Sequence, residues 1–138
     1  MAIRKIPNNT EWFHYHNENP KDNRAADCVF RAIGFATGNG WDKAYDSLCE
    51  MGRKLKRAPN EKATYEKWLA ANGWVKHKQP KKWNGTKFTV QEFLEDYFTD
   101  GRTVIISVAN HLTVAYDHQL YDTWDCSYKC VGNYWASE

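Results

Sequence analysis

Three residues of this chain have the side-chain chemistry of a nucleophilic catalytic site: Cys28, His111 and Asp122. A thiolate attacks a carbonyl carbon, an imidazole takes and returns a proton, and a carboxylate fixes the imidazole tautomer and stabilises its positive charge. Each residue alone also has a structural interpretation, as a packed thiol, a strand histidine or a structural acid. Together, in the chain order Cys, His, Asp, they form the set that a cysteine hydrolase uses.

The segment around Cys28 predicts a helix that begins beside the thiol. Asp27 is a suitable N-cap, and Val29 and Ile33 are apolar residues at helical spacing, so we expect a helix over 27–37. A helix N-terminus carries unpaired amides and the positive end of the helix dipole. Both favour the thiolate, so this position would lower the pKa of Cys28.

His111 and Asp122 fall in a predicted β-hairpin over 111–125. With a two-residue turn at 117–118, the two side chains share a face as diagonal neighbours, close enough to meet. A three-residue turn would reverse the faces and bring Asp125 into the place of Asp122. We prefer the shorter turn because Asp and His are enriched at positive φ, and we keep Asp125 as the reserve acid.

The elements that would position these residues fall into two groups along the chain. Helices are expected in the first hundred residues, at 27–37, 41–56, 60–72 and 89–98. Strands are expected mostly after them, at 103–108, 111–116, 120–124 and 128–131, with an edge strand at 11–16 and a short extended piece at 74–76. Helices first and strands last predict a single α+β domain over 1–138, with the helices packed on an antiparallel sheet.

Composition and charge argue against several classes of function. The net charge of +2 over 138 residues is too small to indicate nucleic acid or an anionic membrane as a partner. Residues 1–25 lack the apolar run of a signal peptide, and no stretch approaches the roughly 18 apolar residues of a membrane span. We therefore expect a cytoplasmic, monomeric protein whose four cysteines are reduced thiols.

No pattern in the chain indicates a cofactor or a metal. His14 and His16 would share one face of a strand, but no third ligand lies nearby in the sequence. Cys126 and Cys130 would need a tight turn between them to hold one ion, and 127–129 contains no glycine or proline to make it. We expect both of these cysteines to be structural thiols.

The arrangement resembles the papain-like cysteine peptidase superfamily, and most closely its small bacterial and phage branches, including the bacteriocin-leader peptidases and transglutaminase-like proteins. The resemblance is carried by 27–33 (DCVFRAI), 110–114 (NHLTV) and 121–125 (YDTWD). In that family the cysteine begins the central helix, the histidine opens a core strand and the acid orients the histidine. The resemblance implies a papain-like fold and thiol-dependent acyl transfer, usually hydrolysis of peptide or isopeptide bonds in a peptide or protein substrate.

One feature departs from the family pattern. Many members carry a glutamine several residues before the cysteine, where it completes the oxyanion hole, and this chain has none there. Asn23, five residues before Cys28, could donate from its side-chain amide instead, or it could be a turn residue. The backbone amide of Cys28 can supply the other hydrogen bond to an oxyanion.

Two functions therefore stand side by side on the sequence. The first is a cysteine peptidase or related thiol acyl hydrolase, and the set of Cys28, His111 and Asp122 favours it. The second is a catalytically silent binding module of the same fold that recognises a peptide or protein partner, with Cys28 packed and Asp122 structural. The missing glutamine favours the second.

Overall fold

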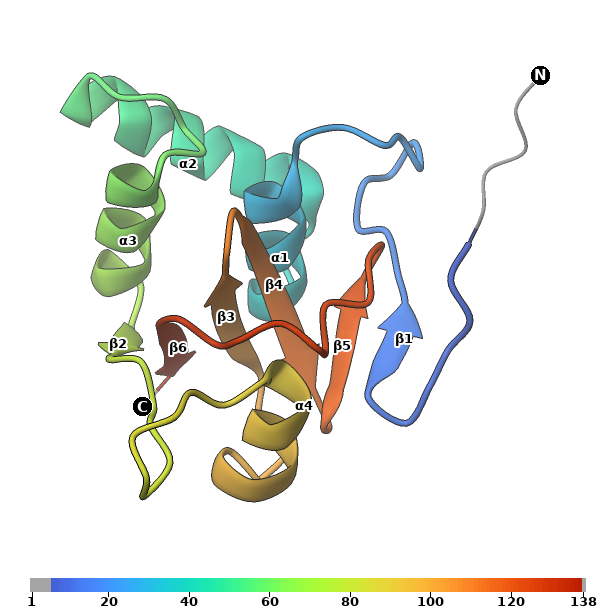
Figure 1. Ribbon diagram of the computed structural model, residues 1–138. Helices are drawn as coiled ribbons and strands as arrows, with labels where there is room; N and C mark the ends of the chain where they lie inside the picture. The colour runs from blue at the N-terminus through green and yellow to red at the C-terminus, as the bar shows by residue number, and fades with distance from the viewer. Residues whose placement is uncertain (1–5, 138) are drawn as a thin grey trace.

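Six short strands form one sheet through the middle of the molecule (Figure 1). The computed structural model describes residues 6–137. The strands are β1 Phe13–Tyr15, β2 Trp74–His77, β3 Val104–Val108, β4 His111–Tyr116, β5 Gln119–Asp122 and β6 Tyr134–Ser137. Their order in the sheet is β1-β5-β4-β3-β6-β2, and every neighbouring pair is antiparallel except β1 and β5, which run parallel. The expected α+β class is confirmed, but the sheet is mixed and not purely antiparallel.

The central hairpin of β4 and β5 has the expected two-residue turn. Asp117 and His118 both adopt positive φ, at 50° and 68°, and Tyr116 pairs with Gln119 across the turn. A turn of two left-handed residues matches the right-handed twist of the strands on either side. The register that follows places His111 and Asp122 on one face of the sheet.

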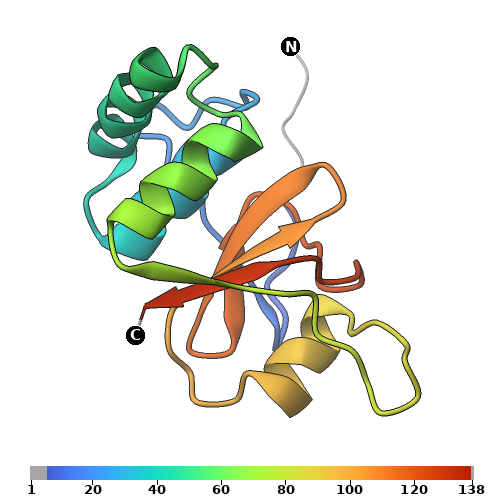
Figure 2. The same ribbon diagram turned by 90° about the vertical axis from the view of Figure 1, so that its left-hand side faces the viewer.

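Three helices cover one face of the sheet: α1 Cys28–Thr37, α2 Trp41–Leu55 and α3 Lys62–Ala71 (Figure 2). The opposite face is covered by the short helix α4 Val90–Glu92, which continues as a π-helix, η1 Phe93–Tyr97. Alternation along the central strands separates the two cores, because Ile105 packs with α1, α2 and α3 whereas Val104 and Ile106 pack with the α4 and η1 side. The sheet thus contributes apolar side chains to both layers.

Some element boundaries differ from the sequence prediction. The expected last strand at 128–131 is wrong, since this segment is a turn with one isolated bridge between Thr89 and Cys130, and the last strand is β6. Helix α3 begins at Lys62 with Glu61 as its N-cap, two residues later than expected. The capping box of Thr89 and Glu92 at the start of α4 is present. Among the residues described, no helix combines the length and apolar character needed to cross a bilayer.

Candidate active site at the N-terminus of α1

Helix α1 presents Cys28 to the start of strand β4. Val29 and Ile33 of the helix pack in one core cluster with Leu112 and Val114 of the strand, which fixes the two elements against each other. Cys28 is the first residue of α1 and is partly exposed. Because no side chain caps the helix, its first-turn amides remain available at this end, as the thiol position in the sequence suggested.

The His111 imidazole and the backbone amide of Leu112 lie close enough to the Cys28 thiol to lower its pKa. Burial by itself would raise the pKa of the thiol, because it disfavours the charged form. The contacts with His111 and Leu112, together with the nearby positive charges of His111 and Arg31, outweigh burial, so the pKa of Cys28 lies below its ordinary value. The thiolate is therefore favoured at this position, as expected for a reactive cysteine.

His111 joins the thiol to a carboxylate. Its Nε2 lies 2.7 Å from Oδ2 of Asp122, as the hairpin register predicted, which leaves Nδ1 for the thiol of Cys28. Burial disfavours the imidazolium, but the hydrogen bonds to Asp122 and Cys28 outweigh it and raise the pKa of His111 to about 9. A protonated imidazole beside a thiol of lowered pKa is the ion pair that activates a cysteine nucleophile.

The Asp122 carboxylate is buried and saturated with donors. Besides His111, it accepts hydrogen bonds at 2.7 Å each from the Thr113 hydroxyl, the Arg31 guanidinium and the backbone amide of Thr123. Burial opposes the charge, but the hydrogen bond and charge of His111, with the charge of Arg31, keep the pKa of Asp122 below its usual value. Asp122 is therefore an ionised partner that holds His111 in place.

Sequence reasoning missed Arg31, which connects the carboxylate of the site to the start of α1. Its Nε donates to Asp27 Oδ1 at 2.8 Å, and its Nη1 donates to Asp122 Oδ1 at 2.7 Å. Asp27 sits at the N-cap position but does not cap the helix, because its other oxygen accepts from Asn19 Nδ2 at 3.0 Å and Trp41 Nε1 at 2.9 Å. The spacing of four between Asp27 and Arg31 was the available signal for this ion pair.

Trp124 covers the far side of His111. The two rings meet edge to face, with centroids 5.0 Å apart and an interplanar angle of 73°. The indole is partly buried against the core under the sheet. This contact holds one edge of the imidazole against the indole.

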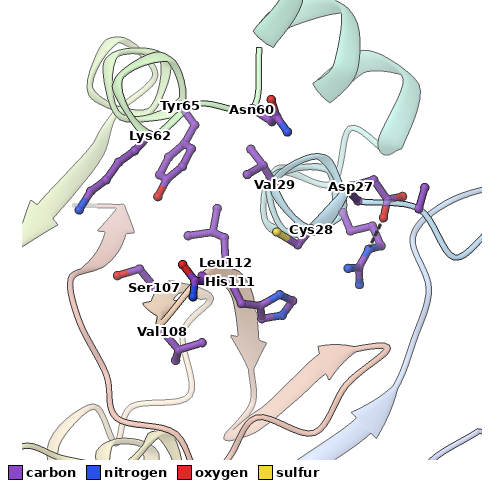
Figure 3. Close-up of a pocket in the computed structure, with 14 residues that line it drawn as sticks. Asp27, Cys28, Val29, Asn60, Lys62, Tyr65, Ser107, Val108, His111 and Leu112 are labelled. Carbon is purple, nitrogen blue, oxygen red and sulfur yellow. Dashed lines mark hydrogen bonds and ion pairs between the residues drawn. The ribbon is translucent and has the colours of Figure 1, made fainter. Parts of the chain in front are cut away.

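Cys28 and His111 open onto a cavity of about 660 Å³ between the start of α1, the start of α3 and the turn between β3 and β4 (Figure 3). A smaller cavity of about 320 Å³ adjoins it on the side of Trp124 and shares Ala25, Asp27 and Arg31 with it. The thiol therefore lies in a depression wide enough for an extended peptide segment to approach it.

The remaining sequence candidates lie apart from the thiol. Asn23 is exposed and borders the smaller cavity, not the one that contains Cys28, so the geometry gives its oxyanion role no support. The reserve acid, Asp125, accepts a hydrogen bond from the backbone amide of Ser127 at 3.1 Å, and the acid bonded to His111 is Asp122.

A second thiol, Cys126, lies close to the same pair of residues. One ligand atom from each of His111, Asp122 and Cys126 lies within 4.8 Å of the others, a grouping that could in principle hold a metal ion. A metal would have to displace the bonds that Arg31 and Thr113 make to Asp122, and burial raises the pKa of Cys126 to about 12, so its thiol is a poor ligand. The donor set does not fit a metal centre.

Comparison of the chain with protein-family models, with curated proteins and with solved structures found no match.

Proposed function

We propose that the protein is a thiol-dependent acyl hydrolase of papain-like fold, a cysteine peptidase that cleaves peptide or isopeptide bonds. The observation that carries the proposal is the hydrogen bond between His111 and Asp122 beside the partly exposed thiol of Cys28, with Cys28 and His111 bordering the same cavity. The opposite shifts in pKa of Cys28 and His111 support a thiolate and imidazolium pair in the resting protein.

In the first half of the reaction, the Cys28 thiolate attacks the carbonyl carbon of the scissile bond. The carbonyl oxygen becomes an oxyanion, and His111 gives its proton to the leaving nitrogen as the carbon–nitrogen bond breaks. In the second half, neutral His111 takes a proton from water as the water attacks the acyl-thioester. The carbon–sulfur bond then breaks, the acid product leaves, and the thiolate and imidazolium are restored.

The oxyanion is stabilised in this scheme by the N-terminus of α1. The backbone amide of Cys28 has no helical acceptor, and the positive end of the helix dipole points toward the developing charge. Asp122 remains ionised throughout and keeps His111 in the tautomer that can serve both halves of the reaction. The charge of Arg31, which pairs with Asp122 at 2.7 Å, supports that ionised state.

The alternative is a catalytically silent binding module, and one observation favours it. No glutamine precedes Cys28, and the candidate that could replace it, Asn23, borders the neighbouring cavity. Loss of one oxyanion donor costs roughly 3–4 kcal/mol of transition-state stabilisation, a large but not complete loss of rate. We favour the enzyme because a binding module needs no activated thiol.

The test is hydrolysis of fluorogenic peptide and isopeptide substrate libraries by the wild-type protein and by Cys28→Ala. The proposal expects turnover in the wild type and background hydrolysis in Cys28→Ala, because the substitution removes the atom that forms the acyl-thioester. Capture of a library peptide by both proteins with no turnover in either would favour the binding module. Turnover that survives in Cys28→Ala would contradict the assignment of the nucleophile.

A further inference from the structure

The wall of the main cavity that faces Cys28 comes from the first turns of α3. Asn60, Lys62 and Tyr65 border the cavity from this side, and Figure 3 shows them opposite the thiol. The N-termini of α1 and α3 therefore both lie at the cavity. Each contributes the partial positive charge of its unpaired amides to the same space.

Tyr65 is a mostly buried residue whose hydroxyl, at the cavity, has no protein partner among the residues described. The side chain is only 7 % exposed, and its ring packs edge to face against Trp135, with centroids 5.9 Å apart. Among the residues described, the hydroxyl makes no hydrogen bond, yet Tyr65 borders the cavity that contains Cys28 (Figure 3). The hydroxyl is therefore free to donate a hydrogen bond to a group that enters the cavity.

Lys62 supplies a positive charge beside that hydroxyl. Three residues apart on α3, the two side chains share one face of the helix, and their polar ends extend toward the strands in Figure 3. Within the part of the chain that the structure describes, Lys62 forms no ion pair. Its ammonium is thus available to a group that enters the cavity.

No acidic side chain in the cavity competes for this pair. The other charged residues that border the cavity are Asp27, Arg31 and His111, and Asp27 is paired with Arg31 at 2.8 Å. The serine on the sheet side, Ser107, is occupied by Asn133, whose carbonyl and amide it contacts at 3.2 and 2.9 Å. Among the residues described, helix α3 therefore offers the cavity two donors, Lys62 and Tyr65, of which Lys62 is charged, and it offers no carboxylate.

We propose that Lys62 and Tyr65 form a carboxylate-binding subsite that selects substrates with an acidic group near the bond that Cys28 cleaves. A carboxylate can accept hydrogen bonds from Lys62 and Tyr65 at once, and its negative charge would pair with the Lys62 ammonium. The subsite rests on the proposed function, since it uses Cys28 as the point at which the substrate reacts. The carboxylate can come from an Asp or Glu side chain or from the C-terminus of a peptide.

Two matched pairs of chloroacetyl compounds test the subsite by alkylation of Cys28. N-chloroacetyl-glutamic acid α-amide is compared with N-chloroacetyl-glutamine amide, which differs only in the side-chain charge. N-chloroacetyl-glycine is compared with N-chloroacetyl-glycinamide, which differs only in the terminal charge. The rate at Cys28 is followed by peptide mapping, so the measurement needs no substrate and no turnover.

The wild-type protein should react about three to ten times faster with one acid than with its amide, the range of a partly exposed charge interaction. The pair that shows the preference identifies the source of the carboxylate. Lys62→Gln should bring the ratio close to one, and Tyr65→Phe should lower it while thermal unfolding shows that the fold is retained. Lys67→Gln, on the same helix but outside the cavity, removes the same charge and should leave the ratio unchanged.

Equal rates for acid and amide in both pairs would overturn the subsite, and so would a preference that survives Lys62→Gln. An equal fall in the ratio in Lys62→Gln and Lys67→Gln would show general attraction and no subsite. Failure of the proposed function has a different signature, because all compounds would then react with Cys28 no faster than with an ordinary thiol. The ratio of acid to amide would still be measured in that case.

Discussion

Two thiols lie on either side of the same pair of residues, His111 and Asp122, and their environments have opposite effects. Cys28 begins a helix, is partly exposed to a cavity and contacts the imidazole, and its pKa is lowered. Cys126 is fully buried, and burial together with the charge of Asp122 raises its pKa to about 12. The environment of Cys28 favours the thiolate, and the environment of Cys126 favours the protonated thiol.

The comparison shows that proximity to a histidine and a carboxylate does not make a cysteine a nucleophile. Cys28 lies beside positive charge, which comes from the imidazolium of His111 and from the amides at the start of α1. Cys126 lies beside the negative charge of the Asp122 carboxylate, which opposes ionisation of the thiol. Burial and the sign of the nearby charge together therefore decide whether the pKa of each thiol is lowered or raised.

Asp122→Asn should have the largest effect, which is on the rate of turnover. An amide can hold the imidazole in the wrong tautomer and cannot stabilise its positive charge, so the rate of turnover should fall by about 10³–10⁴. Because Asp122 also pairs with the partly buried Arg31, the variant should unfold at a lower temperature, and rates are compared well below that temperature. Asp125→Asn is the matched control, and a loss of rate as large as that of Asp122→Asn would contradict the assignment of the acid.

The next prediction concerns Arg31, the cation that pairs with the Asp122 carboxylate. Arg31→Met removes the cation that pairs with the buried acids Asp27 and Asp122, and it should lower the free energy of unfolding by about 2–4 kcal/mol. Arg57→Met removes an exposed arginine from its pair with Glu61 and should cost less than about 1 kcal/mol. Denaturant unfolding measures both. A similar cost in the two variants would show that the buried network adds little to stability.

The smallest effect should come from Cys126→Ala. The thiol is fully buried, so the substitution removes a few packing contacts and should lower the free energy of unfolding by about 1–2 kcal/mol. Turnover should stay close to that of the wild type, because the proton of Cys126 takes no part in the reaction. A large loss of turnover with the fold intact would give the second thiol a role that its raised pKa argues against.

The pH dependence of stability should also report the pKa shifts of His111 and Asp122. The pKa of His111 is raised to about 9, so its protonated form stabilises the fold fully below the ordinary histidine pKa of about 6.5, and this contribution is lost as pH rises through 9. The pKa of Asp122 is lowered, so its contribution is present above the ordinary aspartate pKa and is lost in acid. Thermal unfolding from pH 6 to 10 should show a fall in stability between about pH 6.5 and pH 9 that His111→Gln abolishes.

Much of the site could be predicted because it depends on local patterns. The helix start at Cys28 is predicted by apolar spacing and by Asp27, although the Asp27 carboxylate does not cap the helix, and the pairing of His111 with Asp122 follows from one two-residue turn. A single residue of error in that turn would have placed the carboxylate on the other face of the sheet. The positive φ of Asp117 and His118 removes that ambiguity in the structure.

The features that escaped prediction depend on contacts between distant parts of the chain. Strand β6 pairs with β3 and β2, and nothing in 134–137 distinguishes it locally from the apolar segment at 128–131. Strand β1 joins the sheet in parallel, beside a strand more than a hundred residues later. Arg31 shows its pairing with Asp27 at a spacing of four, but its pairing with Asp122 spans 91 residues.

The most direct test of the account is the rate of alkylation of each of the four cysteines by iodoacetamide from pH 5 to 10, followed by peptide mapping. Cys28 should react faster than an ordinary thiol at pH 6, because its lowered pKa leaves more thiolate there. Exposed Cys130 serves as the internal reference and should react with the profile of an ordinary thiol, while buried Cys126 should hardly react. His111→Ala should move the Cys28 profile to higher pH. A Cys28 that reacts no faster than Cys130 at pH 6, in a folded protein, would contradict the activated thiol and the function built on it.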